Sequence, residues 1–248
     1  MNGAIVANGA SQRKNGAIYS RILQVLPSKV REEVLRVCHP VEFPPTHIIY
    51  RAGEPVEDAY FINSGLVSLI KGMADGRTTV IGAVGAEGLV GVFAAAGFER
   101  ALADYIVEVP LAAFRVHCNV LRREMAQHAA LRHLIMNYLF LISDRIAEIS
   151  ACNRLHSLEQ RCCQWLLVAG DSACSDEFHL THEFLASLLG VQRSSVSTTA
   201  KGLQERGGIR YSHGHITILD RAVLEANACE CYRTRRRRID EAFDSPAV

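Results

Sequence analysis

The chain has 248 residues, a formal net charge of +1 and eight cysteines. This length favours two domains, each with its own core, and the near-neutral charge excludes a globally basic protein, so any nucleic-acid binding depends on a local basic surface. The cysteines lack the regular spacing of a disulfide framework, and residues 1–14 lack the apolar core of a signal peptide. We therefore expect a reduced, cytoplasmic setting.

The first part of the chain combines a polar tail with two short helices. Residues 1–17 are polar and glycine-bearing, and a loose, flexible tail is predicted there. Residues 18–26 and 27–37 have amphipathic patterns, and Ser28 is placed to cap the second helix directly after Pro27.

From residue 41 the pattern changes to short apolar runs separated by turn residues. Residues 59–63 and 66–71 flank Ser64-Gly65, which predicts a hairpin. Asp75-Gly76 is a strong turn signal before residues 78–81, and residues 103–109 and 112–116 close the series around Pro110. Many short strands at regular intervals are typical of an all-β sandwich or barrel.

Residues 80–98 form an apolar run of nearly the length of a membrane span. Glu87 lies at its middle, and five glycines interrupt it. A buried charge and repeated glycines are unfavourable in a transmembrane helix, so we expect buried strands joined by glycine turns and no membrane contact.

Beyond Asn119 the spacing of apolar residues becomes helical. Six of them step by 4, 3, 4, 4 and 3 positions, the spacing of a coiled-coil-like seam. The helix also carries Leu134, Leu139 and Leu141, which are expected to pack on the β domain. Two apolar faces indicate two partners, the β domain and a second copy of the helix. The predicted dimer seam consists of Leu131, Ile135, Tyr138, Ile142, Ile146 and Ile149.

Residues 180–206 (LTHEFLASLLGVQRSSVSTTAKGLQER) predict two short helices that meet at Gly190-Val191. Thr181 is placed to cap the first helix, and Gly190 can adopt the left-handed conformation that ends it. In the second helix the buried face recurs at i, i+4 and i+7, and the opposite face is basic and hydroxyl-bearing. The buried face is Val196, Ala200 and Leu203, and the outward face is Arg193, Ser194, Ser197, Thr198 and Lys201.

This outward face differs from that of an ordinary solvated helical hairpin. Residues 194–199 hold five serines and threonines, which are indifferent helix formers, and no carboxylate precedes Glu205. Arginine can bond to guanine, and lysine and hydroxyl groups can reach phosphates. Two strand-like runs follow, at residues 209–211 and 216–219, around a turn at 212–215. A helix, turn, helix and hairpin in this order indicate a DNA-binding winged helix.

The order of a β domain, a long helix and a winged helix-turn-helix resembles the Crp/Fnr family of bacterial transcription regulators. The resemblance covers residues 18–224 and is most specific at residues 53–70 (GEPVEDAYFINSGLVSLI) and 180–209. It implies an α+β fold with an N-terminal double-stranded β-helix (a β-roll of the cyclic-nucleotide-binding type). The expected domains are a tail at 1–17, the β-roll at 18–124, a dimerisation helix at 125–156 and the winged helix-turn-helix at 157–248.

The resemblance also implies a homodimer on a pseudo-palindromic site in double-stranded DNA, with RNA polymerase as a further partner. Arg193, Ser194 and Thr198 align with base-reading positions of the family. Many members carry Glu in place of Ser194 and Arg in place of Thr198, so a different half-site is expected. Gln192, Ser195 and Lys201 align with phosphate-contacting positions. The predicted DNA-binding set is Thr181, Gln192, Arg193, Ser194, Ser195, Ser197, Thr198, Lys201 and His213.

The sensor segment departs from the cyclic-nucleotide-binding members that it resembles. Those members have Gly-Glu-Leu and then Arg-Ser, in which glutamate holds the ribose hydroxyl and arginine the phosphate. Here the segment aligns as Gly91-Val92-Phe93, and Ala101 follows Arg100, so the glutamate and the serine are absent. We expect a small-molecule effector other than cyclic AMP. The predicted pocket consists of Val92, Phe93, Phe98, Arg100 and Ile106.

The remaining cysteines and basic residues have structural interpretations. Cys162-Cys163 are expected to be buried thiols. Cys229 and Cys231 come close in fold order to His213 and His215 of the wing, but their spacing matches no familiar zinc pattern, so no metal or cofactor is assigned. The arginine run at 233–238 favours a solvated helix end over a DNA contact.

An enzyme and a small-molecule sensor are the two alternatives to a transcription regulator. No nucleophile, base or metal constellation stands at the spacing of an enzyme site, so an enzyme is not expected. A small-molecule sensor without sequence-specific DNA function is the alternative, and the outward face of residues 193–201 argues against it.

Overall fold

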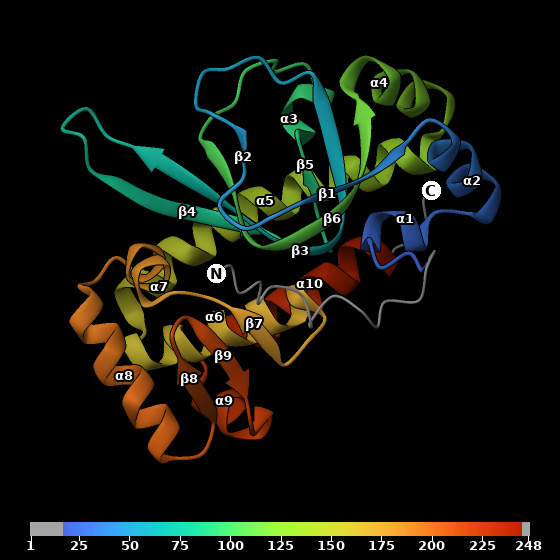
Figure 1. Ribbon diagram of the computed structural model, residues 1–248. Coiled ribbons are helices and arrows are strands. Elements are labelled where there is room, and N and C mark those ends of the chain that lie inside the picture. The colour runs from blue at the N-terminus through green and yellow to red at the C-terminus, as the bar shows by residue number, and fades with distance from the viewer. Residues whose placement is uncertain (1–16, 245–248) are drawn as a thin grey trace, which may run out of the picture.

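The computed structural model describes residues 17–244, so all but the last residue of the predicted tail lies outside the described residues. Figure 1 shows a β-roll in the upper half, the long helix α5 running behind it, and a second domain below. Helices α1 (Arg21–Val25) and α2 (Ser28–Arg36) come first, as predicted, although Pro27 rather than Ser28 occupies the N-cap of α2.

Six antiparallel strands form the β-roll. They are β1 (His39–Phe43), β2 (Ile48–Tyr50), β3 (Asp58–Gly72), β4 (Thr78–Val84), β5 (Leu89–Val90) and β6 (Asp104–His117). Their central order is β1-β6-β3-β4, with β2 paired to β6 and β5 to β3. The short helix α3 (Val92–Ala95) lies between β5 and β6 in the chain. Residues 80–98 thus hold the predicted strands, and also the short helix α3, which was not predicted.

The predicted hairpin at Ser64-Gly65 is wrong, because β3 continues through it and pairs with β6 on both sides. The register shifts here, and Pro110 and Leu111 lie opposite Gly65 in a bulge. A Cβ on Gly65 would lie 2.4 Å from the Pro110 carbonyl oxygen, so only glycine permits this approach. Proline fits a bulge because its missing N–H is not needed there. The two strands therefore bend at this point rather than end.

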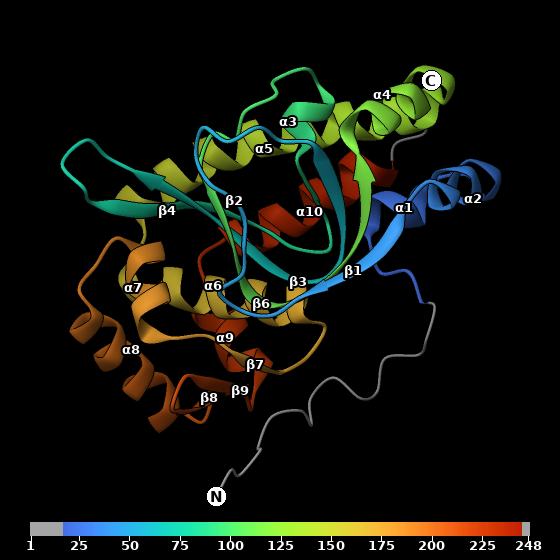
Figure 2. The same ribbon diagram turned by 45° about the horizontal axis from the view of Figure 1, so that its top comes forward.

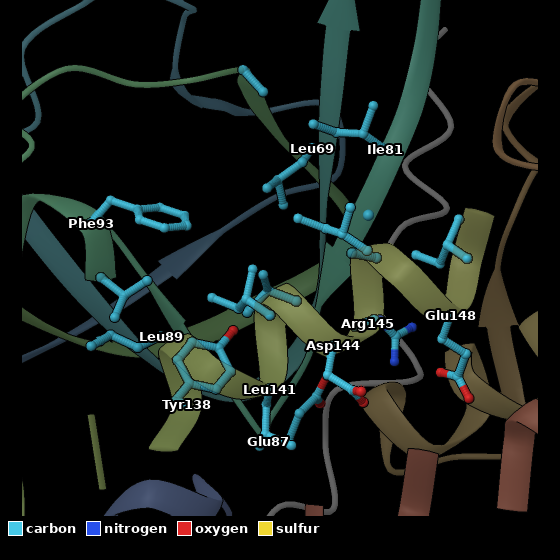
Figure 3. Close-up of a pocket in the computed structure, with 18 of the residues that line it drawn as sticks. Leu69, Ile81, Glu87, Leu89, Phe93, Tyr138, Leu141, Asp144, Arg145 and Glu148 are labelled. Carbon is cyan, nitrogen blue, oxygen red and sulfur yellow. The ribbon is translucent and has the colours of Figure 1, made fainter. Parts of the chain in front are cut away.

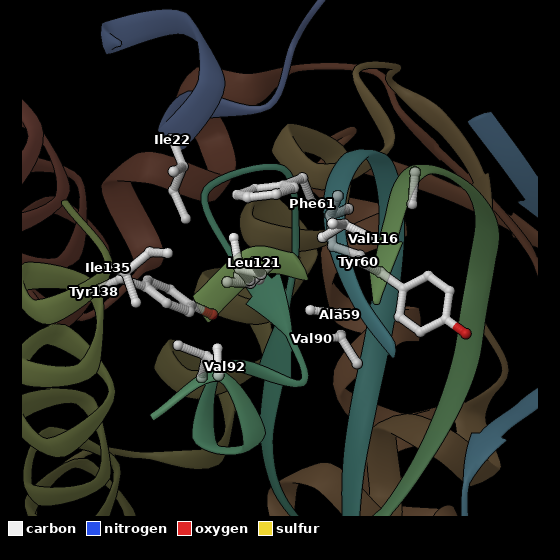
Figure 4. Close-up of a cluster of buried hydrophobic side chains, with 14 of the residues drawn as sticks. Ile22, Ala59, Tyr60, Phe61, Val90, Val92, Val116, Leu121, Ile135 and Tyr138 are labelled. Carbon is white, nitrogen blue, oxygen red and sulfur yellow. The ribbon is translucent and has the colours of Figure 1, made fainter. Parts of the chain in front are cut away.

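The core of the β-roll is closed by α4 (Cys118–Gln127) and α5 (Ala129–Leu155). Figure 4 shows Phe61 and Val116 from the sheet beside Leu121 of α4, with Ile135 and Tyr138 of α5 across the core. The N-terminal half of α5 is therefore part of the β-roll's own hydrophobic core.

The second domain is a winged helix-turn-helix. It holds α6 (Leu158–Ala173), β7 (Glu177–His179), α7 (His182–Leu189), α8 (Arg193–Glu205), β8 (Ile209–Ser212), β9 (His215–Ile218) and α9 (Arg221–Asn227). A capping box of Ser157 and Gln160 begins α6. The three strands form one sheet in the order β7-β9-β8. The predicted helix-turn-helix and hairpin are both present.

The last helix, α10 (Cys231–Asp244), leaves the winged domain and lies along α5 (Figures 1 and 2). Arg235 is only 8% exposed and pairs with Glu87, which lies between β4 and β5, while Arg238 pairs with Asp144 of α5. The expectation of a solvated basic helix end is therefore corrected for Arg235 and Arg238, whereas Arg233, Arg236 and Arg237 are exposed. Burial would raise the pKa of Glu87, but the Arg235 and Arg145 guanidiniums hold it below its usual range.

The two domains share a hydrophobic contact in addition to α10. Leu66, Val80 and Val109 of the β-roll belong to one cluster with buried residues of α6 and α7. The winged domain is thus packed against the β-roll in this conformation. Of the helices within residues 17–244, none combines the length and apolar character needed to cross a membrane.

Candidate DNA-binding surface and sensor cavities

The turn between α7 and α8 is built as the sequence predicts. The Thr181 hydroxyl oxygen accepts a 3.1 Å hydrogen bond from the Phe184 N–H and so caps α7. Gly190 ends α7 with a φ of 66°, in the left-handed region. Val196 and Leu203 are fully buried and fix α8 to the domain. These contacts determine which face of α8 meets solvent.

That solvent face carries most of the predicted DNA-binding residues. Gln192, Arg193, Ser194, Ser197, Thr198 and Lys201 are exposed, and Ser195 is half-buried. Lys201 lies 3.9 Å from Glu205, an exposed pair that contributes little to stability and leaves the ammonium accessible. α8 lies at the lower left edge of the molecule in Figure 1, away from the β-roll.

The hydroxyl groups of this face already donate to the helix backbone. The Ser197 hydroxyl lies 3.1 Å from the Arg193 carbonyl oxygen, and Thr198 makes the same bond to Ser194. A hydroxyl that donates to the backbone keeps its lone pairs, so it can accept a bond from a base amino group. The guanidinium of Arg193, by contrast, is a pure donor suited to guanine.

His182 was missed by the sequence reasoning. Its ring stacks on Tyr211 of β8 with centroids 3.8 Å apart, and its Nδ1 lies 3.0 Å from the Ser197 hydroxyl oxygen of α8. Burial and the Arg193 charge lower the pKa of His182 below its usual range. One side chain of α7 therefore connects α8 to the wing. A histidine in the first turn of a helix gives no periodic signal by which this role could be found.

Arg161 of α6 was also missed. Its Nη1 donates 2.9 Å bonds to the Leu189 carbonyl oxygen and to the Asn153 side chain of α5. A cation at a helix C-terminus neutralises the unpaired carbonyls there, so Arg161 stabilises the end of α7 and connects it to α5.

The wing turn consists of His213 and Gly214. Their φ values are 49° and 82°, which suits the tight two-residue turns that follow the twist of a β-hairpin. The His213 side chain is exposed at the tip of this turn, beside the Ser212 hydroxyl at 3.0 Å. The structure therefore places His213 on the surface, next to a hydroxyl group.

The predicted effector pocket is not formed as a single site. Phe93, Phe98 and Arg100 line a cavity of only ≈ 10 Å³, and Val92 and Ile106 lie outside it. Phe98 is 67% exposed, and Arg100 Nη1 donates a 2.7 Å bond to the Gly53 carbonyl oxygen. The five residues do not converge because Ile106 pairs with β2 and β3, whereas Val92 is buried in the core and lines, with Phe93, a second cavity.

A larger cavity of ≈ 150 Å³ lies between the sheet, α5 and α10 (Figure 3). Its walls are mainly apolar and include Leu69, Ile81 and Tyr138. Arg145 reaches this cavity, and its Nε and Nη2 atoms are buried without a hydrogen-bond partner among residues 17–244. Burial and the nearby Arg235 charge lower the pKa of Arg145 to about 9.

The predicted dimer seam lies mostly inside one protomer. Leu131, Ile135 and Tyr138 are buried in the core of the β-roll, which corrects their assignment to a dimer interface. Ile142 and Ile149 are half-buried and line the ≈ 150 Å³ cavity together with the exposed Ile146. The apolar spacing of α5 thus reflects the packing of this helix on the β-roll of the same protomer.

Comparisons with known proteins agree with this architecture. Residues 40–128 match the model of the cyclic nucleotide-binding domain, and residues 160–227 match the Crp-like helix-turn-helix domain. FixK2 from Bradyrhizobium japonicum aligns with a TM-score of 0.66 at 15% identity, over 78% of this chain and 98% of that chain. CLP of Xanthomonas campestris, described as a c-di-GMP responsive global regulator, aligns at 0.60 and 18% identity, over 78% of this chain and 100% of that one.

A CRP-family transcriptional regulator from Thermus thermophilus aligns with a TM-score of 0.62 at 23% identity, over 76% of this chain and 96% of that chain. No curated protein sequence matches the chain. A β-roll joined by a long helix to a winged helix-turn-helix defines a two-domain DNA-binding transcription regulator rather than an enzyme. The chain belongs to the Crp/Fnr family.

Proposed function

We propose that the protein regulates transcription by sequence-specific binding of double-stranded DNA through α8 and the wing. The observation that carries this proposal is the exposed face of α8, where Arg193 and Ser194 stand on the first turn and Thr198 and Lys201 on the next two. Arginine and hydroxyl groups discriminate bases, and lysine contacts phosphate at any sequence. Three further points remain predictions from the sequence. They are the domain boundaries at residues 18, 125 and 157, RNA polymerase as a partner, and a cytoplasmic setting.

The active form in this proposal is a homodimer that forms through the face of α5 opposite its buried seam. Met136 and Phe140 are 53% and 68% exposed there, unusually high values for large apolar side chains. They continue through Ser143, Ala147 and Ser150 in steps of 4, 3, 4 and 3, a heptad spacing on the exposed side. Small residues at three of these positions permit close approach of a second α5.

An effector in this proposal occupies the ≈ 150 Å³ cavity rather than the predicted pocket around Arg100. The cavity wall is mainly apolar, its charged residues are gathered around Arg145, and the Arg145 guanidinium has buried N–H groups to satisfy. A small apolar molecule with an acidic group fits both features, because burial strengthens its bond to arginine. Octanoate is a suitable probe in calorimetry. Binding to the wild type and to Arg100→Met, with loss in Arg145→Met, is expected; equal binding by all three would exclude this site.

Selection from random duplexes, followed by gel-shift titration, tests DNA binding directly. Arg193→Ala is expected to lose about 1–3 kcal/mol at the selected site and to relax base choice at one position. Lys201→Ala is expected to weaken all duplexes alike and to reduce the salt slope by about 1.

Arg36→Ala is the matched control, since Arg36 is an exposed arginine on α2 at the opposite end of the molecule. Its affinity and selectivity should equal those of the wild type. If no duplex is enriched, or if Arg193→Ala reduces binding to random and selected DNA equally, direct readout of bases by α8 is excluded. The alternative, a small-molecule sensor without sequence-specific DNA binding, is then favoured.

A further inference from the structure

Four metal-ligating side chains converge where the winged domain joins α5. Cys152 and His156 come from the C-terminal end of α5, and Cys229 and Cys231 from the junction between α9 and α10. One ligand atom of each lies within 4.8 Å of all the others. The three cysteines are buried and form a cluster of their own, separate from the two large hydrophobic cores. The partners of Cys229 and Cys231 are thus Cys152 and His156, whereas His215 of the wing lies against His179.

The separations match a tetrahedral metal site. With metal–sulfur bonds of about 2.3 Å and a metal–nitrogen bond of about 2.0–2.1 Å, a tetrahedron separates two sulfurs by about 3.8 Å and sulfur from nitrogen by about 3.5 Å. The Sγ atoms of Cys152 and Cys229 are 3.7 Å apart. His156 Nδ1 lies 3.4 Å from Cys152 Sγ and 3.6 Å from Cys231 Sγ. Three edges of the tetrahedron therefore agree with one coordination geometry.

The surroundings of the cluster orient the histidine as a ligand. His156 Nε2 lies 3.1 Å from the Glu230 carboxylate, on the side of the ring away from the sulfurs. A proton held on Nε2 by that carboxylate leaves the lone pair of Nδ1 directed at the cysteines, the arrangement that carboxylates give to metal-bound histidines. The thiols of Cys229 and Cys152 lie 3.1 Å and 3.5 Å from the Oε1 atom of the buried Gln164, and a half-turn of this amide presents its NH2 group to the sulfurs once they are thiolates.

Two other interpretations, buried thiols without a metal and an iron–sulfur cluster, explain this geometry less completely than a single metal ion does. Buried thiols that act only as small apolar groups do not require a histidine held with its lone pair toward them. Cys162 and Cys163 are such thiols, buried in α6 among apolar side chains. An iron–sulfur cluster spaces its thiolates more widely than three sulfurs around one ion, because the cluster itself lies between them. Three sulfurs and one nitrogen match the ligand sets of structural zinc.

We propose that Cys152, His156, Cys229 and Cys231 bind one zinc ion, and that this site fixes the C-terminal segment to the end of α5. Each cysteine loses its thiol proton to solvent as its sulfur binds the ion, and His156 binds through neutral Nδ1. The two pairs of ligands lie on opposite sides of the winged domain in the sequence. A bound ion therefore restrains the connection between α5 and α6 and holds α10 along α5.

Metal analysis of the purified full-length protein is the first test. Mass spectrometry of metals is expected to find about one zinc per chain, and cobalt substitution should give the strong visible absorption of tetrahedral cobalt thiolate. Removal of the ion with a chelator should lower the melting temperature, and added zinc should restore it.

Cys229→Ser and His156→Ala are expected to lose the cobalt spectrum and the response of the melting temperature to zinc. Cys163→Ser is the matched control, since it removes a buried thiol outside the cluster. It should retain both signals even if it lowers overall stability. Glu230→Gln should still bind cobalt but with weaker affinity, by about 10–100-fold, because only the orientation of His156 is disturbed. Because the Glu230 side chain is exposed, Glu230→Gln should fold, and it keeps the test valid if Cys229→Ser does not fold.

Three results would overturn the proposal. The first is a wild-type protein that neither contains nor takes up zinc or cobalt under reducing conditions. The second is a cobalt spectrum that is unchanged in Cys229→Ser. The third is the broad visible absorption of an iron–sulfur cluster in protein purified without oxygen. A disulfide between Cys152 and Cys229 that forms in air but leaves no zinc binding after reduction would contradict it equally.

Discussion

His182 illustrates how one side chain can connect three elements of the winged domain. It starts in α7, stacks on Tyr211 in β8 and meets Ser197 in α8. Burial of the ring and the nearby Arg193 cation both disfavour a positive charge on His182. The ring is therefore most stable when neutral, and the packing of α8 against the wing depends on that state.

The stability of the protein is expected to fall as the pH drops from 7 to 5. The folded-state pKa of His182 lies below its ordinary value of 6.5, so the unfolded chain binds more protons between these two pKa values. The contribution of neutral His182 is complete above pH 6.5 and decreases as the pH falls toward the folded-state pKa. Denaturant unfolding at a series of pH values measures this slope.

His182→Gln should reduce the slope between pH 7 and pH 5. Burial and His215 also lower the pKa of His179, so His179→Gln should remove a separate part of it. A slope that is unchanged in His182→Gln would contradict the role given to this residue.

Arg100 leads to a prediction about what the β-roll does not bind. Its guanidinium is bonded to Gly53, Val92 is buried where the family's ribose-binding glutamate would stand, and the adjoining cavity measures ≈ 10 Å³. Each lost charged hydrogen bond forfeits about 1.5–3 kcal/mol, so two losses move a micromolar site toward millimolar. Calorimetry with cyclic AMP and cyclic GMP should detect no micromolar binding. Micromolar binding that Arg100→Ala abolishes would refute this prediction.

At the scale of the element, α10 shows that a run of arginines need not be a nucleic-acid contact. Arg235 and Arg238 face α5 and the β-roll, where Glu87 and Asp144 neutralise them, and Arg21 of α1 pairs with Asp240. Ion pairs to α1, to α5 and to the loop between β4 and β5 thus attach the C-terminal helix to the β-roll side of the molecule. The same helix begins at Cys231, so the proposed zinc site and the ion pairs restrain it at both ends.

Removal of Arg235 should detach α10. Arg235→Ala leaves the buried carboxylate of Glu87 without its hydrogen-bonded cation, and breaking a buried pair in this way costs about 3–5 kcal/mol. Chemical denaturation measures the loss, and hydrogen exchange should show faster exchange along α10.

Arg237→Ala is the control on the same helix. Arg237 and Glu241 form an exposed pair, and such pairs contribute about 0–1 kcal/mol. Equal destabilisation by the two variants would mean that the burial of Arg235 does not matter for stability.

At the scale of the whole molecule, two sides of α5 are covered within residues 17–244, its C-terminal end carries the metal-ligating cluster, and one side is exposed. The β-roll covers one side, α10 a second, and the end of the helix carries Cys152 and His156. The face of Met136 and Phe140 is left exposed. This is where the proposed second protomer would bind.

A charge at Phe140 should separate the dimer. Phe140→Glu places a carboxylate in the proposed heptad seam, at a cost of several kcal/mol if it is buried there. Sedimentation should show a folded monomer that binds a palindromic duplex poorly. Phe98→Glu is the matched control, because Phe98 is equally exposed but lies in the β-roll, and it should remain dimeric. A wild-type protein that sediments as a monomer at micromolar concentration would disprove the proposed dimer.

Local sequence alone determined the winged helix-turn-helix. The cap at Thr181, the end of α7 at Gly190 and the buried Val196, Ala200 and Leu203 all appear as predicted. Capping bonds, left-handed turns and the helical repeat act between residues a few positions apart, so a short stretch of sequence contains the whole signal. The family resemblance added that the β domain, predicted from its short strands, is a β-roll.

Only the tertiary structure decided which elements meet. The apolar period of α5 showed that the helix has a buried face, but not that Leu131 and Ile135 pack on their own β-roll. Gly65 and Pro110 looked like turn residues because their role in a bulge depends on each other's position across two strands. Cys152 and Cys229 are separated by 77 residues, and only the path of α10 back along α5 brings them together. Such contacts arise from the packing of distant segments, which no local spacing encodes.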